Sequence, residues 1–468
     1  MLAVALIVRA RDFGNPTVHV DEQYYLLVGD RLLHGALPYV DIWDRKPLGL
    51  FLIFAAIRLL PGDGILAYQL VAALFAAATA WLVMLGGRRL GANALGAFLG
   101  GAAYILWLSF LSGRAGQSPV FYNLFMAGAG LLTLYLPERA ARGDRWWIFW
   151  SGCAACLLAG LAIQTKYTPA IEGAFFGLVH LWAMRRAGGS LAVIAAASLV
   201  WMALGIAPTA LVIAFYAARR ASDFHAFWYS NFESITQRRS YPAMKIVDRL
   251  AGTSAQLLPF IAAAILVWRE RPRAQETWVV FGWLAAALVA FAAVGSFFDH
   301  YALPLMIPLA MIAAWALGRS RILRAFTAVG AVILIVFHLT TEPDFRGSAR
   351  SVARLMAQKD GNECPYVFAG DSVLYLLAKA CVPTAYAFPS TLAYEPERGA
   401  TGIDEAAEVR RIMDRRPPVV VTMDEPLAPW NVASKAIVSA ELAKHYRLTM
   451  TAPREEGNLL VYVRRDLK

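Results

Sequence analysis

Charge is scarce in this chain of 468 residues. Lys, Arg, Asp and Glu together make up 16% of it, against about 25% in soluble proteins, while hydrophobic residues reach 59%. That balance excludes an ordinary soluble domain and indicates an integral membrane protein. The formal net charge of +11 does not predict a nucleic-acid partner, because the basic residues occur in short clusters between apolar runs, where they set membrane orientation.

Cysteine is also rare, and the four cysteines of the chain are too few for a disulfide scaffold. Cys153 and Cys156 fall within one apolar run, so we expect them to pack between helices and not to bind metal. Cys364 and Cys381 lie in a more polar C-terminal region. Because the topology below places that region outside the cytoplasm, a disulfide and two free thiols are equally expected there.

Apolar runs of about 20 residues, enough to cross a bilayer as a helix, recur along the chain. We predict spans at 65–86, 92–111, 118–136, 146–163, 168–184, 190–216, 253–268, 277–296, 301–317 and 322–340. The opening run, Met1 to Val8, is too short to span, and we interpret it as the end of a truncated first helix, which makes eleven spans. A cleaved signal peptide is the alternative, but the run has no basic start and no small-residue cleavage site.

Arginine is unevenly shared between the two sets of short loops that these spans create. One set contains the basic clusters at 88–89, 139–145, 185–186, 269–273 and 319–324, whereas the opposite set contains only Arg114 and Lys166. The positive-inside rule makes the first set cytoplasmic. The first loop at 9–47, the long loop at 217–252 and the tail from residue 341 then all face outward.

The tail, residues 341–468, has a different character from the apolar part, residues 1–340. Short β-like runs at 366–369, 418–422 and 459–463 alternate with helical stretches at 405–414 and 433–445. This pattern predicts a small α/β domain. It contains no glycine-rich phosphate loop and no nucleophile motif, so a structural or acceptor-docking role is expected. The predicted fold is a polytopic α-helical membrane protein with a C-terminal extracytoplasmic α/β domain.

The first loop is unusually rich in charge for a segment between apolar runs. Its acids and bases are Asp21, Glu22, Asp30, Arg31, Asp41, Asp44, Arg45 and Lys46. Such a loop can be a solvated segment pinned by ion pairs, or it can supply a base, an acid and a phosphate-binding cation. Asp21 and Glu22 are suited to opening a short helix, whose N-terminal dipole favours negative charge. The apolar run after Pro47 is too short to span and suits the membrane interface.

An ordered set of motifs resembles a known family. The set comprises Asp21-Glu22 after the first span, Tyr39-x-Asp41, Lys46-Pro47-Leu48-Gly49, Gly87-Arg88-Arg89, the segment 164–169 and the segment 299–304. Together they resemble the GT-C glycosyltransferases that use polyprenyl-phosphate sugars. Lipopolysaccharide-core glycosyltransferases, lipid A aminoarabinose transferases and protein O-mannosyltransferases belong to this superfamily. The resemblance covers roughly residues 1–340, includes the extracytoplasmic tail domain, and implies a bacterial inner-membrane protein with its site facing the periplasm.

The resemblance implies a role for several residues of the first loop. Asp21 matches the catalytic carboxylate and would be the general base, with Glu22 orienting it or sharing its role. Lys46 would neutralise the leaving phosphate, with Arg45 as a helper. The aminoarabinose branch has a Glu directly before the lysine, where this chain has Arg45. The second carboxylate is therefore either Asp41 or Asp44.

That branch also has an arginine at the position of Tyr24, so one phosphate contact must come from elsewhere. Lys166, His300 and Tyr301 are candidates because they are predicted at the outer membrane face. A lysine there can equally snorkel to the interface, and a lone histidine more often ends a helix. The candidate substrate-contacting residues are Tyr25, Arg219, Arg220, Trp228, Tyr229, Arg238 and Arg239. An interfacial aromatic belt is the alternative explanation for those in the long loop.

The leading hypothesis is an inverting glycosyltransferase that moves a hexosyl or pentosyl group from a polyprenyl-phosphate donor. Its acceptor would be a glycolipid, a glycan or a protein outside the cytoplasm. A lipid-linked sugar flippase or transporter is the alternative. It predicts polar residues deep within the spans, whereas the centres of the spans are mostly apolar here. An O-antigen-type ligase is a third hypothesis. No cofactor is required by the sequence, and a divalent metal is left open because the acids show no fixed ligand spacing.

Overall fold

The computed structural model describes residues 1–239, 241–271, 274–341, 344–359, 363–454 and 457–467. Arg273, which the basic loop at 269–273 includes, lies outside these ranges. The chain folds into two compact units. The first unit contains residues 1–12, 69–213 and 242–340, and the second contains residues 13–68, 214–241 and 341–468. Most of the first loop, residues 9–47, and of the long loop, residues 217–252, therefore groups with the tail.

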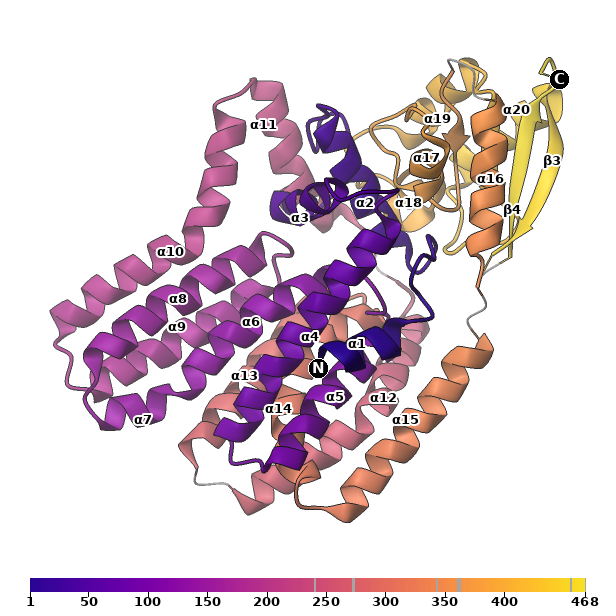
Figure 1. Ribbon diagram of the computed structural model, residues 1–468. Helices are drawn as coiled ribbons and strands as arrows, with labels where there is room; N and C mark the ends of the chain where they lie inside the picture. The colour runs from indigo at the N-terminus through magenta and orange to yellow at the C-terminus, as the bar shows by residue number, and fades with distance from the viewer. Residues whose placement is uncertain (240, 272–273, 342–343, 360–362, 455–456, 468) are drawn as a thin grey trace. The chain divides into compact units, whose positions relative to one another are not determined.

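The first unit is almost entirely helical (Figure 1). Its elements are α1 (Leu2–Arg9), α4 (Ile65–Arg89), α5 (Ala94–Phe110), α6 (Ser118–Leu134), α7 (Leu136–Ala141), α8 (Arg145–Ile163), α9 (Pro169–Arg186), α10 (Leu191–Ala217), α12 (Ala243–Glu270), α13 (Gln275–Val294), the 3₁₀ helix η3 (Asp299–Leu305), α14 (Met306–Leu317) and α15 (Arg321–Thr341). Helices α4 and α10 each run a few residues into the second unit, and α15 runs one residue into it.

Eight helical segments in the described part of the chain are long and apolar enough to cross a membrane. Each coincides with a predicted span. Helices α5 and α9 occupy the predicted spans at 92–111 and 168–184, but α5 is only 17 residues long and the 18 residues of α9 include Glu172, Arg185 and Arg186. Helix α1 has eight residues, as expected for the short opening run. The total of eleven spans stays a prediction.

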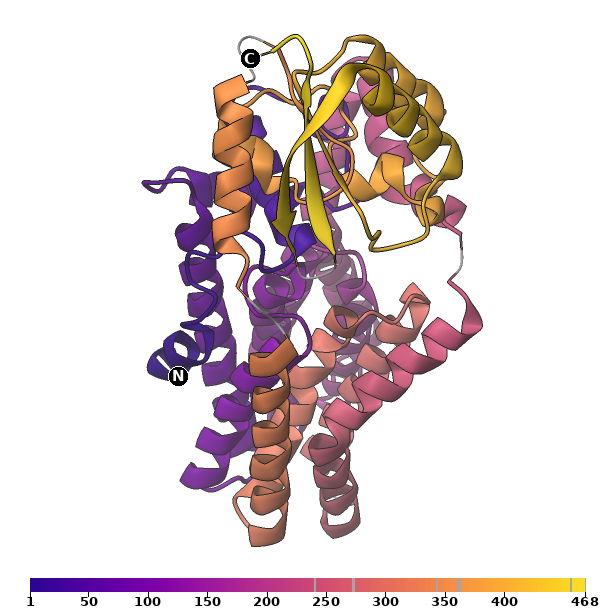
Figure 2. The ribbon, with the colours of Figure 1, turned by 90° about the vertical axis from the view of Figure 1, so that its right-hand side faces the viewer.

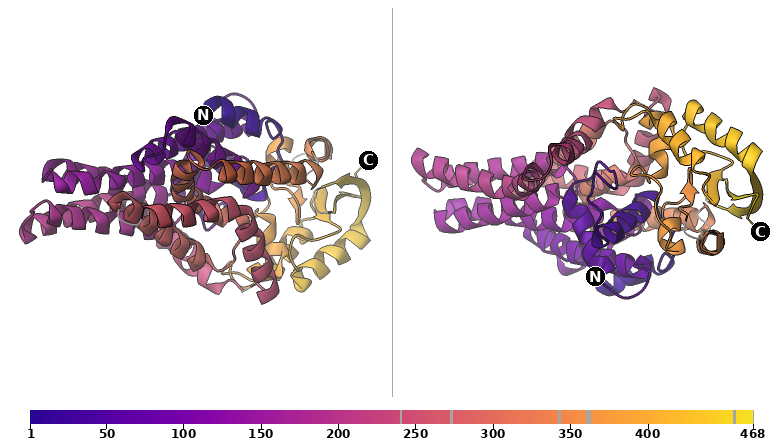
Figure 3. Two further views of the ribbon diagram at one scale, coloured as in Figure 1. Left: turned by 90° about the horizontal axis from the view of Figure 1, so that it is seen from below. Right: turned by 90° about the horizontal axis from the view of Figure 1, so that it is seen from above.

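Small residues let the helices of this unit pack closely. At Gly100 of α5, a Cβ atom would lie 2.8 Å from the carbonyl oxygen of Ala310 on α14, so only glycine allows this approach. The start of α5 is fixed by Asn93, whose side chain accepts a hydrogen bond from the Gly96 amide at 2.8 Å. Helices α6, α8 and α9 also pack against one another. They run side by side in the views from below and from above (Figure 3).

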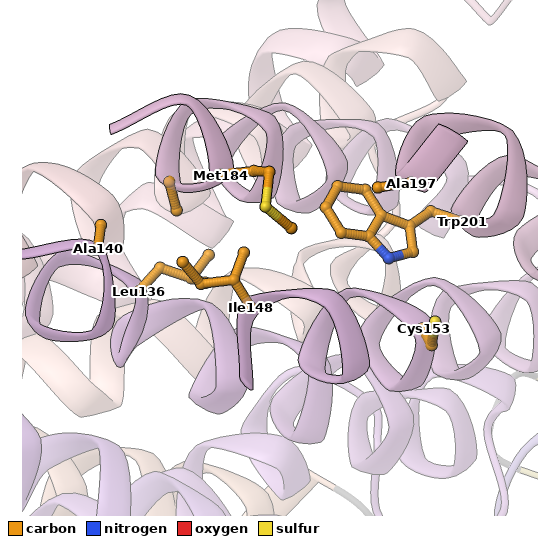
Figure 4. Packing of buried hydrophobic residues seen from close by; sticks show 8 residues of the cluster. Leu136, Ala140, Ile148, Cys153, Met184, Ala197 and Trp201 are labelled. Atoms are coloured by element: carbon orange, nitrogen blue, oxygen red, sulfur yellow. The ribbon is translucent and has the colours of Figure 1, made fainter. Parts of the chain in front are cut away.

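A buried apolar cluster joins α7, α8, α9 and α10 (Figure 4). Ile148, Met184 and Trp201 form part of it, and the Trp201 indole donates a hydrogen bond to the Phe149 carbonyl at 3.0 Å. Cys153 lies in the same cluster and is buried. Its position agrees with the predicted helix-packing role.

The second unit combines short helices with one sheet (Figure 2). Its helices are α2 (Val20–Leu33), α3 (Leu48–Arg58), α11 (Ala221–Trp228), the π-helix η1 (Tyr229–Glu233), the 3₁₀ helix η2 (Ser234–Gln237), α16 (Arg346–Lys359), α17 (Val373–Ala378), α18 (Pro389–Ala393), the 3₁₀ helix η4 (Glu395–Glu397), α19 (Glu405–Asp414) and α20 (Val432–His445). The strands are β1 (Tyr366–Val367), β2 (Val419–Met423), β3 (Tyr446–Pro453) and β4 (Asn458–Arg464).

The sheet has the order β1-β2-β4-β3, with β1 parallel to β2 and the other pairs antiparallel. Strand β4 alternates buried and partly exposed residues, as expected for a strand with one face on a core. Three of the four strands and helices α19 and α20 lie where the tail sequence predicts them. Strand β3 is not predicted, because four of its central residues, Arg447 to Met450, are exposed or only partly buried and give no apolar run.

The tail also contains a disulfide between Cys364 and Cys381. The two cysteines are 17 positions apart in the sequence. Of the two states that the sequence leaves open, the structure has the disulfide.

Candidate active site in the first loop

Helix α2 begins at the Asp-Glu pair, as predicted. His19 caps the helix, its Nδ1 accepting a hydrogen bond from the Asp21 amide at 3.3 Å. Both acids occupy the first turn, where the helix dipole stabilises negative charge. Glu22 is fully buried, whereas Asp21 keeps exposed surface. Asp21 is therefore the acid of the pair that a substrate in solvent can reach.

Asp44 is the second carboxylate of the cluster. Its Oδ1 accepts hydrogen bonds from the backbone amides of Arg45 at 2.5 Å and Lys46 at 2.9 Å. Burial raises the pKa of Asp44, the positive charge of Lys46 lowers it, and the negative charge of Asp21 raises it further. Asp21, Asp44 and Lys46 are thus electrostatic neighbours.

Asp41 has a different environment. It is exposed, and its Oδ2 accepts a hydrogen bond from the Leu37 amide at 2.7 Å. That bond closes the turn in which Tyr39 adopts a positive φ of 70°. Asp41 therefore stabilises the shape of the loop, and Asp44 is the carboxylate that faces Lys46.

Aromatic residues support the lysine. The Lys46 Nζ lies 5.5 Å from the centre of the Tyr25 ring, and the Tyr39 hydroxyl donates to the Lys46 carbonyl at 2.8 Å. Tyr25 is only 1% exposed and packs edge-on against Phe54 of α3. The structure therefore places Tyr25 beneath Lys46, in the core between α2 and α3, and not on a surface that a sugar could stack on.

Close packing fixes α2 against α3. A Cβ atom at Gly29 would lie 2.7 Å from the backbone nitrogen of Ala55, so the two helices can meet only at a glycine. An ion pair between Asp30 and Arg58, with a nitrogen–oxygen distance of 3.0 Å, joins the same two helices. The helix that carries Asp21 and the helix that follows Lys46 thus form one scaffold.

Arg45 is engaged by a carboxylate from the tail. Its guanidinium lies 2.6 Å from Glu397, donates to the Ser234 hydroxyl at 3.0 Å and donates to the Ala400 carbonyl at 3.1 Å. Arg238 binds the other oxygen of Glu397 at 2.8 Å. Two predicted substrate-binding arginines therefore share one buried carboxylate, which limits their freedom to bind a phosphate.

The other predicted residues of the long loop lie around α11 and η1. Arg239 pairs with Glu395, Arg219 lies 3.5 Å from Asp223, and Arg220 is exposed at the start of α11. Trp228 is 38% exposed and its ring lies 4.7 Å from that of Phe232. Tyr229 is partly buried, which raises its pKa, while the nearby charge of Arg45 lowers it.

The remaining phosphate candidates belong to the first unit and gather at η3. Lys166 lies in the turn between α8 and α9, and its Nζ is 3.9 Å from the centre of the Tyr301 ring. The His300 ring is 4.4 Å from the same ring. Arg249 of α12 adds a cation nearby, because its guanidinium is 3.7 Å from the ring of Phe298, one residue before η3. The three predicted residues therefore form one cation and aromatic cluster.

Metal binding finds no support from side-chain clustering. Within the ranges that the structure describes, no three His, Cys, Asp or Glu side chains gather so as to hold a metal ion.

Comparison with known proteins gives matches among solved structures. No protein-family model and no curated protein matches the chain. ArnT from Cupriavidus metallidurans in the apo state is 17% identical, with a TM-score of 0.65 over 98% of this chain and 96% of that one. The chain has an ArnT-like fold. ArnT bound to undecaprenyl phosphate matches with a TM-score of 0.62 at the same identity and coverage. An Archaeoglobus fulgidus oligosaccharyltransferase in the apo form is 11% identical, with a TM-score of 0.54 over 97% of this chain and 79% of that one.

The likeness shows that the chain shares its fold with ArnT. Together with the apolar helices it also supports a multi-pass membrane protein. At these identities the likeness concerns the fold, and the roles of individual residues rest on the site geometry.

Glu397 is the main residue of the site that the sequence does not reveal. It lies more than 350 positions from Arg45, in a polar segment with no motif. Its only local signal is its place in a short acidic segment with Glu395, and charge alone cannot predict a partner so distant in sequence.

Proposed function

We propose that the chain is an inverting glycosyltransferase that transfers a sugar from a polyprenyl-phosphate donor to an acceptor outside the cytoplasm. The observation that carries the proposal is the placement of Asp21 in the first turn of α2 and of Lys46 just before α3, which packs closely against α2, in a chain with an ArnT-like fold. A base and a cation side by side are what this reaction needs, because the acceptor hydroxyl is a poor nucleophile and the leaving group is a phosphate.

In the proposed reaction Asp21 takes the proton of the acceptor hydroxyl. The hydroxyl oxygen attacks the anomeric carbon from the face opposite the phosphate, so the configuration inverts. The bond between the anomeric carbon and the phosphate oxygen breaks, and the polyprenyl phosphate leaves with the electron pair. Lys46 stabilises the negative charge that develops on that phosphate. Asp44, held by the two loop amides, keeps Lys46 oriented and tunes the charge near Asp21.

The proposed donor class follows from the lipid in the similar structure, which is ArnT bound to undecaprenyl phosphate. Lys166, His300 and Tyr301 stay proposed phosphate-binding residues of the first unit by itself, because they combine a cation with hydrogen-bonding groups in one cluster. Arg45 and Arg238 are not needed in this role, since Glu397 already neutralises them in part. The proposed location is the bacterial inner membrane, with the first loop and the tail in the periplasm.

A transfer assay in membrane vesicles tests the proposal. Vesicles from a deletion strain contain the unmodified acceptor, and they would receive the purified protein with undecaprenyl-phosphate-linked hexoses and pentoses carrying a radiolabel. We expect label in the acceptor with wild-type protein and at least about a hundredfold less with Asp21→Asn. Asp63→Asn is the matched control, because Asp63 is an exposed acid that pairs with Arg350. Equal transfer by Asp21→Asn and the wild type would contradict the proposal.

The same vesicles distinguish transfer from transport. A flippase would move the labelled lipid across the membrane without breaking its sugar–phosphate bond. Protection of intact donor from an added phosphodiesterase, with no label in the acceptor, would favour the flippase. Mass analysis of envelope glycolipids from the deletion strain would then identify the missing sugar and the acceptor.

A further inference from the structure

Gln23, the residue after the Asp-Glu pair, is part of a buried polar network with the tail. Its side-chain amide nitrogen donates to Asp371 at 3.0 Å, and its amide oxygen accepts from the Val373 backbone amide at 3.5 Å. Arg454 binds both oxygens of Asp371, at 3.0 and 3.2 Å through its Nε. Gln23 and Asp371 are each 1% exposed. All of these residues belong to the second unit.

The network has a strict polarity. An amide side chain can donate to Asp371 and accept from the Val373 amide at the same time, which neither a carboxylate nor an ammonium group can do. Arg454 neutralises the charge that Asp371 would otherwise bury alone. The ion pair therefore acts as a fixed acceptor for Gln23, and the start of α17 acts as a fixed donor.

The position of Gln23 on α2 determines what it can control. Two residues along an α-helix are separated by about 200° around its axis, so Gln23 and Asp21 lie on opposite faces. A carboxylate about 6 Å from the axis moves by about 1 Å when the helix turns by about 10°. A displacement of about 1 Å at a reacting group can cost about a hundredfold in rate. A hydrogen-bonded anchor on the opposite face resists that rotation.

The far end of the first loop is anchored to the tail as well. The Trp43 backbone amide donates to the Ala385 carbonyl at 2.8 Å, and Arg45 pairs with Glu397. Each carboxylate of the proposed site, Asp21 and Asp44, thus lies within two residues of a contact with residues 371–397. Because these contacts are directional hydrogen bonds, the tail fixes the position of the loop.

We propose that Asp371 and Arg454 are positioning residues, which hold α2 through Gln23 and thereby set the orientation of Asp21. The tail is then part of the catalytic machinery and not an accessory for acceptor docking alone. The proposal rests on the function proposed above only for the role of Asp21 in sugar transfer. The anchor itself is a statement about the structure of α2 and can be tested without any sugar transfer.

Gln23→Met is the variant of choice, because methionine has a similar size, leaves the Asp371–Arg454 pair intact and removes both hydrogen bonds. We expect kcat for sugar transfer to fall about tenfold to a hundredfold, with donor KM changed less than about threefold, since Lys46 is untouched. Glu363→Gln is the matched control, because it removes the ion pair with Arg464 of β4 in the same unit. We expect its kcat to stay within about twofold of the wild type.

Hydrogen–deuterium exchange of the full-length protein in detergent provides a readout that is independent of activity. We expect peptides covering residues 20–28 to exchange at least about tenfold faster in Gln23→Met and Arg454→Met, while strand β2 stays protected. If Arg454→Met also loses protection in β2, that variant has unfolded globally. The test of the anchor then depends on Gln23→Met, which keeps the ion pair between Asp371 and Arg454. Unchanged exchange at 20–28 in Gln23→Met would overturn the anchor.

The outcomes separate the two proposals. Faster exchange at 20–28 with no sugar transfer by the wild type would leave the anchor standing and reject the glycosyltransferase. Transfer by the wild type with the same kcat in Gln23→Met would leave the enzyme standing and reject the positioning role. A lower kcat in Gln23→Met together with an unchanged melting temperature would support positioning over a loss of stability.

Discussion

Glu397→Gln should destabilise the second unit far more than its neighbour Glu395→Gln. Glu397 is a single carboxylate between two guanidiniums, those of Arg45 and Arg238, at 2.6 and 2.8 Å. Its side chain is 8% exposed, and those of the arginines are 15% and 22% exposed. Glutamine keeps the shape and one acceptor oxygen but leaves the two positive charges facing each other without neutralisation.

The expected loss follows from burial. Removing one partner of a buried ion pair costs about 3–5 kcal/mol, and the partly exposed arginines place this case at the lower end, about 3 kcal/mol. Melting temperature falls by about 2–4 °C per kcal/mol in a unit of 150–250 residues, so we expect a decrease of about 6–12 °C. Glu395 pairs with Arg239 at 29% and 55% exposure, and an exposed pair contributes at most about 1 kcal/mol.

Thermal unfolding of the full-length protein in detergent, followed by tryptophan fluorescence at one heating rate, measures both shifts. We expect a difference of at least about 4 °C between the melting temperatures of the two variants. A melting temperature of Glu397→Gln within about 2 °C of the wild type, or an equal decrease in Glu395→Gln, would contradict this expectation. Either result would mean that the arginines are solvated well enough to do without the carboxylate.

Three further predictions concern the cluster and the tail. Lys46→Met should lower kcat by about a hundredfold to a thousandfold, and Lys46→Arg should recover part of it, because a cation again faces the phosphate. Asp44→Asn should lower kcat yet leave the melting temperature at pH 7 unchanged or higher, whereas Asp41→Ala, which removes the acceptor oxygen, should lower the melting temperature through its lost turn bond. The Cys364→Ser, Cys381→Ser double variant should lose about 3 kcal/mol of stability, the chain-entropy value for a loop closed over 17 positions. Dithiothreitol should lower the melting temperature of the wild type by as much, and no change would contradict the entropy argument.

Much of the fold could be predicted because it depends on periodic, local signals. Apolar runs placed the long helices of the first unit within a few residues, except that α12 begins at Ala243, well before the predicted span at 253–268. The Asp-Glu pair marked the start of α2. The tail strands at β2 and β4 were predicted because each carries a continuous or alternating apolar pattern. Strand β3 carries neither, and its structure depends on pairing with β4. Long-range pairing leaves no trace in a local pattern.

The residues of the candidate site could be named from the sequence for the same reason, and their roles stay predictions. Asp21, Glu22 and Lys46 stand in motifs, and motif spacing is a local property. The local sequence could not decide between Asp41 and Asp44, because both acids lie within six residues of Lys46 and differ only in the residues that fold around them. Partners from the tail, such as Glu397 and Asp371, could not be predicted without a three-dimensional contact.

Asp44 shows why such a choice has an energetic consequence. Burial raises its pKa above the ordinary value of 3.8, so the folded protein binds a proton at Asp44 more tightly than the unfolded chain does. The stabilising contribution of that proton is complete below the unfolded pKa and is lost as the pH rises through the folded pKa. At neutral pH an ionised Asp44 therefore lowers the stability of the fold, and Lys46 offsets only part of that cost. Asparagine removes the charge and keeps the oxygen that accepts from the Arg45 and Lys46 amides, which is why Asp44→Asn should not lower the melting temperature. A residue whose removal preserves stability but abolishes turnover is retained for chemistry, so a melting temperature that falls by more than about 4 °C in Asp44→Asn would assign Asp44 to the scaffold instead.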